Sequence, residues 1–377
     1  MYVGYKLKPA MLRDLAIVLI VGSLWMVPAT TAQNAFEVER QAALDQVAWV
    51  ERAYAERLGP RGAESRQRVK TEESALRDSL GWFSRNAEGD QALRLAVPLG
   101  YFWTYEGRVE QARDLLTTIL ALPSALAQTQ IRAKGLSDAG ALALRQRDQA
   151  ASRELNAESL RISRRLQDKE GVATALLGLS RAALLDMDYA SVRRYAEESA
   201  VLRRDLDDRS GQAAAMHMLA AVARIQGQYG KAAELYQFSL AANREAGWDV
   251  PVAAELFNLG YVRLRQGKAD DARKLFTESL QKYRDLQDEA GIAYTLTGFA
   301  SIAVAQKQPT RAARLYGAAL AMFERFNVTL DPDDQLDVDH YTARLLTLIS
   351  PDVFKAASAD GRTSSPERAI ALALGAP

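Results

Sequence analysis

Cysteine is absent from this sequence of 377 residues, and histidine occurs only twice, as His217 and His340. Without cysteine the chain has no disulfide framework and no thiolate chemistry. The two histidines lie in unrelated stretches, and no HExxH, GxSxG or glycine-rich phosphate-binding pattern accompanies them. Because catalysis needs a positioned acid, base, nucleophile or metal, the sequence predicts that the protein is not an enzyme and has no cofactor or metal site.

An excess of charge of one sign is also missing. Lysine and arginine number 48, aspartate and glutamate number 47, and the formal net charge is +1. No excess of positive charge indicates nucleic acid as a partner. The acidic run from Asp331 to Asp339 suggests calcium, but it lacks the glycine and the closing glutamate of an EF-hand loop. We therefore expect this run to be solvated and to cap a helix.

The longest apolar run is short and lies near the N-terminus. It extends from Leu15 to Val27, which is less than the roughly 20 residues needed to span a bilayer. Three basic residues precede it and the small residues Thr30 to Ala32 follow, in the three-part form of a secretory signal. We expect residues 1–32 to be a signal peptide and the mature protein, beginning near Gln33, to be periplasmic or secreted. The alternatives are an uncleaved anchor, which would be the chain's only membrane contact, and a cytoplasmic protein.

Most of the remaining chain repeats itself with a period of about 40 residues. Residues 251–291 read as two amphipathic helices joined by a turn at Gln266–Ala269. Three positions of this hairpin recur through six repeats with no gap, two of them always small or compact and one mostly leucine. The three series are Gly100, Gly140, Ser180, Ala220, Gly260 and Ala300; Ala112, Ser152, Val192, Ala232, Ala272 and Ala312; and Leu120, Leu160, Ala200, Leu240, Leu280 and Leu320.

These recurring residues predict how the hairpins pack. A small residue is needed where two helices cross closely, and the large residues Tyr236, Phe276 and Tyr316 then fill the space beside the crossing. One hairpin cannot bury its apolar faces alone, so it needs copies of itself as neighbours. The sequence therefore predicts an all-α solenoid of six stacked hairpins over residues 93–330.

The order of residues within one hairpin resembles the tetratricopeptide repeat, here with a lengthened period. The matching residues are Leu259, Gly260, Gly267, Ala272, Phe276, Ser279 and Leu280. Within that family the chain is similar to the long-period repeats of MalT-like bacterial regulators, which are signal-transducing ATPases. The resemblance implies a right-handed superhelix whose first helices line a concave face.

This resemblance extends from about Phe36 to Leu374. Ser74–Trp82 resembles the segment that leads into the repeats of those regulators, and Ala312–Ala319 and Phe354–Leu374 resemble their closing segment. No GxxxxGK[ST] loop precedes the repeats and no DNA-reading helix-turn-helix follows them. The resemblance therefore implies the sensing or docking part of such a regulator.

Helical caps are predicted at both ends, over residues 33–92 and 331–377. The first contains helices at Phe36–Leu58 and at about Ala63–Phe83. The second contains three helices that begin near Pro332, Pro351 and Pro366, because proline is favoured in the first turn. A solenoid must cover its terminal apolar face, so we expect residues 331–377 to do this.

The resemblance also implies a partner-binding surface on the concave face. Aromatic residues and arginine are enriched at interface hot spots, and we expect the arginines to be exposed toward a partner. The alternative is that residues such as Tyr101 and Phe257 pack between adjacent first helices. The lysines of a carboxylate clamp are not matched, so a C-terminal carboxylate ligand is not indicated. The predicted partner-binding residues are Tyr101, Tyr105, Arg145, Arg181, His217, Arg224, Phe257, Asn258, Tyr261, Arg265 and Tyr294.

The sequence thus predicts a non-enzymatic scaffold, exported from the cytoplasm, that binds a protein or peptide through its concave face. The alternative is a ligand-sensing regulatory subunit, membrane-anchored or cytoplasmic, that controls an ATPase or a transcription regulator on another chain. The sequence does not identify the partner, since one solenoid groove suits many unrelated ligands.

Overall fold

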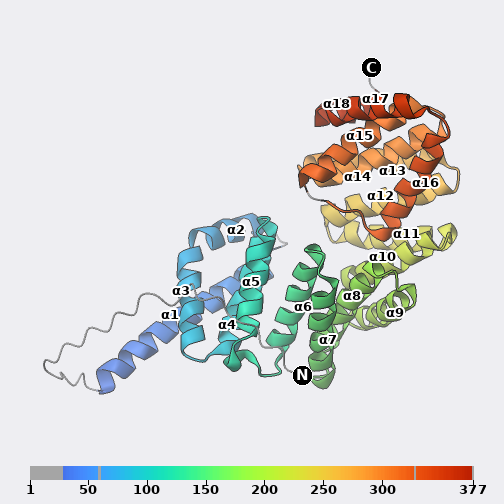
Figure 1. Ribbon diagram of the computed structural model, residues 1–377. Helices are drawn as coiled ribbons and strands as arrows, with labels where there is room; N and C mark the ends of the chain where they lie inside the picture. The colour runs from blue at the N-terminus through green and yellow to red at the C-terminus, as the bar shows by residue number, and fades with distance from the viewer. Residues whose placement is uncertain (1–28, 58–60, 327, 376–377) are drawn as a thin grey trace, which may run out of the picture.

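A computed structural model describes residues 29–57, 61–326 and 328–375 of the chain. These residues form eighteen α-helices and one short 3-10 helix, with no strand among them (Figure 1). The predicted all-α hairpin solenoid is confirmed. Most of the predicted signal peptide, residues 1–28, lies outside the described residues.

Six helical hairpins form the body of the stack, and they run from Gly89 to Phe326, where the sequence predicted residues 93–330. Most of their helices have 17 residues and are joined by three-residue turns. The first and second helices of the six hairpins are α4 (Gly89–Tyr105) and α5 (Val109–Leu120), α6 (Gln130–Arg145) and α7 (Gln149–Arg165), α8 (Lys169–Leu185) and α9 (Tyr189–Asp205), α10 (Arg209–Ile225) and α11 (Tyr229–Glu245), α12 (Asp249–Arg265) and α13 (Ala269–Asp285), and α14 (Glu289–Ala305) and α15 (Pro309–Phe326).

The turns between these helices share one conformation, which recurs at a constant spacing along the stack. A residue with positive φ ends each regular helix, as at Gly247, Gly267, Gln287 and Lys307. This left-handed residue allows its N–H to bond back to the last turn of the helix and so satisfies a terminal carbonyl. Aspartate then caps several of the following helices; the Asp288 carboxylate, for example, accepts a bond from the Gly291 N–H at 2.9 Å.

The predicted crossing residues lie in the core. The series from Ala112 to Ala312 is completely buried at all six positions. Phe276 fills the space between two small residues of neighbouring first helices, since a Cβ added to Gly260 would lie 2.5 Å from its ring and one added to Gly298 would lie 2.6 Å from it. The leucine series is buried or half-buried except at Leu320 of α15, which is exposed.

The joint between the first and second hairpins differs from the others. Nine residues separate α5 from α6, and they include the 3-10 helix Pro123–Ala125. The buried Arg132 guanidinium ties this joint together by donating to the carbonyls of Leu120 and Ala125, at 2.9 and 2.8 Å. Glu158 of α7 balances its charge at 2.9 Å.

Three helices precede the hairpins: α1 (Ala29–Ala55), α2 (Gly62–Thr71) and α3 (Glu73–Arg85). The single helix predicted over 63–83 is therefore wrong, because it is interrupted at Glu72. Glu73 begins α3 and pairs with Arg108 at the start of α5, at 2.7 Å, which holds this end of α3 against the α4–α5 turn. The apolar side chains of α1 and α3 join the core of the first hairpin.

Three helices follow the hairpins, but only two of them cover the end of the stack. The helices α17 (Pro351–Arg362) and α18 (Pro366–Leu374) pack on α15. Gly317 and Gly361 permit backbone contact between α15 and α17, since a Cβ on either would lie within 2.1 Å of a carbonyl oxygen of the other helix. By contrast, α16 (Pro332–Leu346) crosses the first helices α10 and α14. The expectation that all of residues 331–377 cap the stack is wrong for α16, whose aspartates pair with arginines of the concave face.

A search of the described helices finds none that is both long and apolar enough to span a bilayer.

The packing at the crossings can be tested with two leucine substitutions. We expect Ala272→Leu to destabilise the protein by about 1–3 kcal/mol through overpacking, since Ala272 is completely buried between helices. Ala241→Leu is the matched control, because Ala241 is exposed on α11. Chemical denaturation followed by circular dichroism measures both, and equal midpoints for the two variants would contradict the packing described here.

Candidate functional site

The concave face holds a groove with a volume of ≈870 Å³. The first helices α6, α8, α10, α12 and α14 contribute side chains to it, and residues 328–334, which lead from α15 into α16, close one side. This crossing segment is fixed at the far wall, where Arg147 of the α6–α7 turn donates to the Leu330 carbonyl at 3.1 Å and lies 3.7 Å from Asp331. The segment that follows hairpin six is therefore tied to hairpin two across the groove.

One wall of the groove is positively charged. Arg145 of α6 and Arg181 of α8 both line it and both keep contact with solvent, and neither forms an ion pair with any described residue. Arg181 lies among protein atoms that displace water; this and the charge of Arg145 lower its pKa, although Asp331 opposes the shift. Two guanidiniums without an ion-pair partner make this wall suitable for an anionic group.

His217 continues this wall onto α10 and contacts a buried carboxylate. Its Nδ1 lies 2.9 Å from Glu255 of α12, and Glu255 also accepts a bond from the Ser239 hydroxyl at 2.6 Å. Burial lowers the pKa of His217, but the charge and hydrogen bond of Glu255 outweigh this and raise the pKa to about 9. His217 is therefore a cation at neutral pH, and Glu255 neutralises it.

Sequence reasoning missed Glu255, although the repeat contains a signal for it. The equivalent residues of other repeats are Ala175, Ala215 and Thr295, so a charged side chain at Glu255 breaks the pattern. A buried serine also recurs at Ser159, Ser199, Ser239 and Ser279, and its hydrogen bond changes at the same repeat. Ser199 and Ser279 each donate to a backbone carbonyl, whereas Ser239 donates to Glu255.

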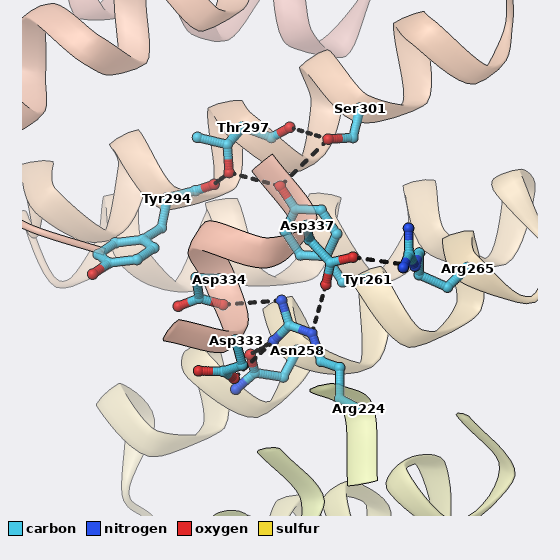
Figure 2. A network of polar contacts seen from close by, with 10 residues as sticks. All are labelled: Arg224, Asn258, Tyr261, Arg265, Tyr294, Thr297, Ser301, Asp333, Asp334 and Asp337. Atoms are coloured by element: carbon cyan, nitrogen blue, oxygen red, sulfur yellow. Dashed lines mark hydrogen bonds and ion pairs between the residues drawn. The ribbon is translucent and has the colours of Figure 1, made fainter. Parts of the chain in front are cut away.

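The other wall is acidic, and it is held by Arg224 of α10, whose side chain is only 1% exposed. Figure 2 shows its guanidinium surrounded by three carboxylates of α16. The distances are 3.1 Å to Asp333, 3.0 Å to Asp334 and 2.7 Å to Asp337. Arg224 also donates to the Asn258 side-chain oxygen at 2.7 Å, so all parts of the guanidinium have partners.

Two residues of α12 complete the contact with α16 (Figure 2). Arg265 lies 3.4 Å from Asp337, and it also donates to the Tyr229 hydroxyl at 2.7 Å. Tyr261 is completely buried beside Tyr341 of α16, and its hydroxyl lies 2.9 Å from that of Thr297. The expectation that Arg224 and Tyr261 are exposed toward a partner is therefore wrong, because α16 covers them.

The acidic run is likewise not simply solvated, since Asp333 and Asp337 are buried in these ion pairs. Arg224 also had a signal in the sequence, as Leu184, Leu264 and Val304 occupy the equivalent positions of other repeats. An arginine at a core position indicates a buried counter-charge as readily as an exposed partner surface. The counter-charge lies far away in the sequence, which a repeat pattern does not reveal.

The acidic wall has more carboxylate than its cations balance. Burial and the neighbouring charge of Asp333 raise the pKa of Asp334 to about 8, although Arg224 opposes this shift. Burial and Asp333 also raise the pKa of Asp331. The groove thus has an excess of positive charge at Arg145 and Arg181 and an excess of negative charge at the start of α16.

The structure brings six of the eleven predicted residues together in the groove and places five elsewhere. Those in the groove are Arg145, Arg181, His217, Phe257, Asn258 and Tyr294. Phe257 is mostly buried among Tyr261, Phe276 and Tyr294, as the packing alternative proposed. Arg224, Tyr261 and Arg265 contact α16, while Tyr101 and Tyr105 lie near the N-terminal helices, beside Tyr54 and Arg66. Tyr105 is 61% exposed.

Within the described ranges, no three or more histidine, aspartate or glutamate side chains are grouped so that they could hold a metal ion. In the acidic wall, the carboxylates surround a guanidinium instead.

Comparison with known proteins identifies the repeat. Residues 252–325 match the tetratricopeptide repeat family model. The match falls on α12 to α15, the fifth and sixth hairpins. No curated protein matches the chain.

A solved structure with a TM-score above 0.5 shows the same fold. The structure of a Rap protein complexed with Competence and Sporulation Factor is 12% identical, with a TM-score of 0.53, and the alignment covers 87% of this chain and 99% of that one. Aspartyl phosphate phosphatase F from Bacillus subtilis is 14% identical, with a TM-score of 0.48, over 85% of this chain and 82% of that one. At such identities the likeness concerns the fold alone.

The raised pKa of Asp334 predicts a pH-dependent stability. A carboxyl whose pKa rises from 3.8 to about 8 on folding contributes stability below about pH 4 that is lost as the pH rises toward 8. Asp334→Asn cannot ionise and keeps an oxygen for Arg224. We therefore expect this variant to be more stable than the original chain at pH 8.5 by at least about 1.4 kcal/mol, the equivalent of one pKa unit.

The measurement is the free energy of unfolding from pH 4.5 to 8.5 for both chains. The contribution of His217 to the pH dependence is the same in both chains, so it cancels when their free energies of unfolding are subtracted. Asp339→Asn, on the exposed side of α16, is the control and should follow the original chain. A constant difference between Asp334→Asn and the original chain across this range would contradict the proposed charge excess.

Proposed function

We propose that this protein is a non-enzymatic scaffold that binds an acidic stretch of polypeptide in the groove lined by α6, α8 and α10. The observation that supports this most directly is the pair Arg145 and Arg181, which line the groove and form no ion pair with the described residues. A carboxylate side chain could accept two parallel bonds from either guanidinium fork.

The dimensions of the groove favour a polypeptide over a compact small molecule. Its ≈870 Å³ is bounded by side chains from five first helices, so it extends along several repeats. Phe257 and Tyr294 add aromatic surface next to the cationic wall. An extended segment with acidic and apolar side chains would meet both surfaces, whereas a small anion would use only the arginines.

A binding role also agrees with what is known of a protein of this fold. The Rap protein was solved in a complex with Competence and Sporulation Factor. The likeness supports binding as the activity but does not identify the partner, because one fold serves many ligands. The closer resemblance to MalT-like regulators stays a prediction.

The proposal predicts which arginines matter for affinity. We expect Arg145→Ala and Arg181→Ala each to weaken binding of an acidic peptide roughly tenfold to thirtyfold, which corresponds to about 1.4–2 kcal/mol. Arg204→Ala is the matched control, since Arg204 is exposed on α9, outside the groove. Fluorescence anisotropy with labelled acidic peptides, and with the same peptides carrying asparagine and glutamine in place of the acids, measures the change.

Circular dichroism of each variant checks that the fold is intact. Because both arginines keep contact with solvent and lack ion pairs, their replacement should leave the stability nearly unchanged. Equal affinity for the acidic and the amide peptides, or an equal loss with Arg204→Ala, would rule out the groove as an acid-binding site.

We further propose that the protein is exported and that its mature chain begins near Gln33. The support is the basic, apolar and small-residue order of residues 1–32. Gln33 is exposed in α1. Mass spectrometry of the protein purified from separated cell fractions tests this, and an intact Met1 in the membrane fraction would indicate an anchor instead.

A further inference from the structure

The helix α16 lies on the concave surface formed by α10, α12 and α14. Its buried side chains form one stripe. Asp333, Asp337, Tyr341 and Leu345 are each at most 5% exposed and follow one another at intervals of four residues. The opposite side of the helix, including Leu336 and Asp339, is exposed. This spacing places two carboxylates, one aromatic ring and one aliphatic side chain along a single face.

The surface beneath this stripe matches it group by group. Arg224 lies 3.1 Å from Asp333 and 2.7 Å from Asp337, and Arg265 lies 3.4 Å from Asp337. Tyr261 lies beside Tyr341, with ring centroids 6.5 Å apart. Tyr341 and Leu345 join the apolar core formed with α14 and α15. The surface therefore recognises a helix by its charge pattern at one end and by its apolar residues at the other.

The stack does not need α16 to close its end. The helices α17 and α18 cover α15 and the end of α14, and α17 makes the closest contact through Gly317 and Gly361. Irregular segments connect α16 on both sides, to α15 and to α17. The helix can therefore leave its surface without uncovering the terminal face of the solenoid.

The charge pairing between α16 and its surface is not optimal. Three carboxylates share Arg224, and burial together with Asp333 raises the pKa of Asp334 to about 8. Buried ion pairs give little net stability because desolvation offsets their attraction. A helix with the same stripe but without an acidic residue at the position of Asp334 would match this surface better.

From these observations we propose that the concave surface of α10, α12 and α14 is a second interaction surface. Its partner is an acidic amphipathic helix with the stripe Asp-x3-Asp-x3-Tyr-x3-Leu. In this structure α16 of the same chain occupies the surface. Such a helix on a partner protein binds by displacing α16. Arg145 and Arg181 lie on α6 and α8, outside this surface, so substitutions there distinguish it from the acid-binding groove, although residues 328–334, which lead into α16, also line that groove.

The test uses peptides that copy residues 330–348, labelled with fluorescein, and the full chain. Asp333→Asn/Asp337→Asn in the chain weakens the hold of α16 on its surface and leaves the surface itself unchanged. We expect this chain to bind the native peptide at least about tenfold more tightly than the original chain does. The reason is that the state in which α16 has left its surface is more populated in this variant. A peptide with Asp334→Asn should bind still more tightly at pH 8, and one with Asp333→Asn/Asp337→Asn should not bind.

Two further substitutions separate this surface from the groove. Arg224→Gln in the weakened chain should abolish binding of the native peptide, whereas Arg145→Ala should leave it unchanged. Equal binding by the original and weakened chains, or binding that survives Arg224→Gln, would overturn the proposal. The reverse pattern, with binding lost on Arg145→Ala alone, would assign the peptide to the groove and would also overturn it.

A second measurement needs no substitution in the chain and so does not depend on a variant that folds. Hydrogen–deuterium exchange of the original chain is compared with and without an excess of the Asp334→Asn peptide. We expect amides of residues 332–346 to exchange faster with the peptide present, while those of α17 and α18 keep their rates. Unchanged exchange in α16 at a peptide concentration that gives bound signal would show that the peptide does not replace it.

Discussion

The close crossing of two helices at a small residue is the constraint on which the rest of this structure depends. Ala272 and its equivalents permit the approach, and Phe276 then fits between Gly260 and Gly298 of neighbouring hairpins. Each hairpin thus completes the core of the next, which is why the stack needs several copies and a covered end. The turns recur at a constant spacing because the crossings fix where each helix must stop.

Against this regular background, the concave face is distinguished by polar residues at positions where other repeats are small or apolar. Arg224 and Glu255 are both buried, and each has an opposite charge within hydrogen-bonding distance. A buried charge is strongly unfavourable without such a partner. These residues therefore fix two contacts that the repeat alone does not specify: the docking of α16, and the pairing of α10 with α12 through His217.

The same residues divide the concave face into two regions of different character. On the side of α6 and α8, Arg145 and Arg181 have no ion-pair partner among the described residues, and both are exposed to solvent. On the side of α10 and α12, arginines are covered by an acidic helix of the same chain. An acidic partner is common to both regions, in one as the proposed ligand and in the other as α16 itself.

The sequence by itself determined the all-α repeat fold, its period and the identity of the crossing residues, because these depend on contacts between neighbouring hairpins that recur along the chain. It also indicated the concave face and six residues of the groove. Tertiary structure alone decided that α16 turns back onto α10 and α12. That contact joins Arg224 to aspartates far away in the sequence, and it occurs only once, so no periodicity marks it. For the same reason the sequence could not show which arginines form ion pairs and which do not. The sequence gives the charge of each residue, but the fold determines which opposite charge lies beside it.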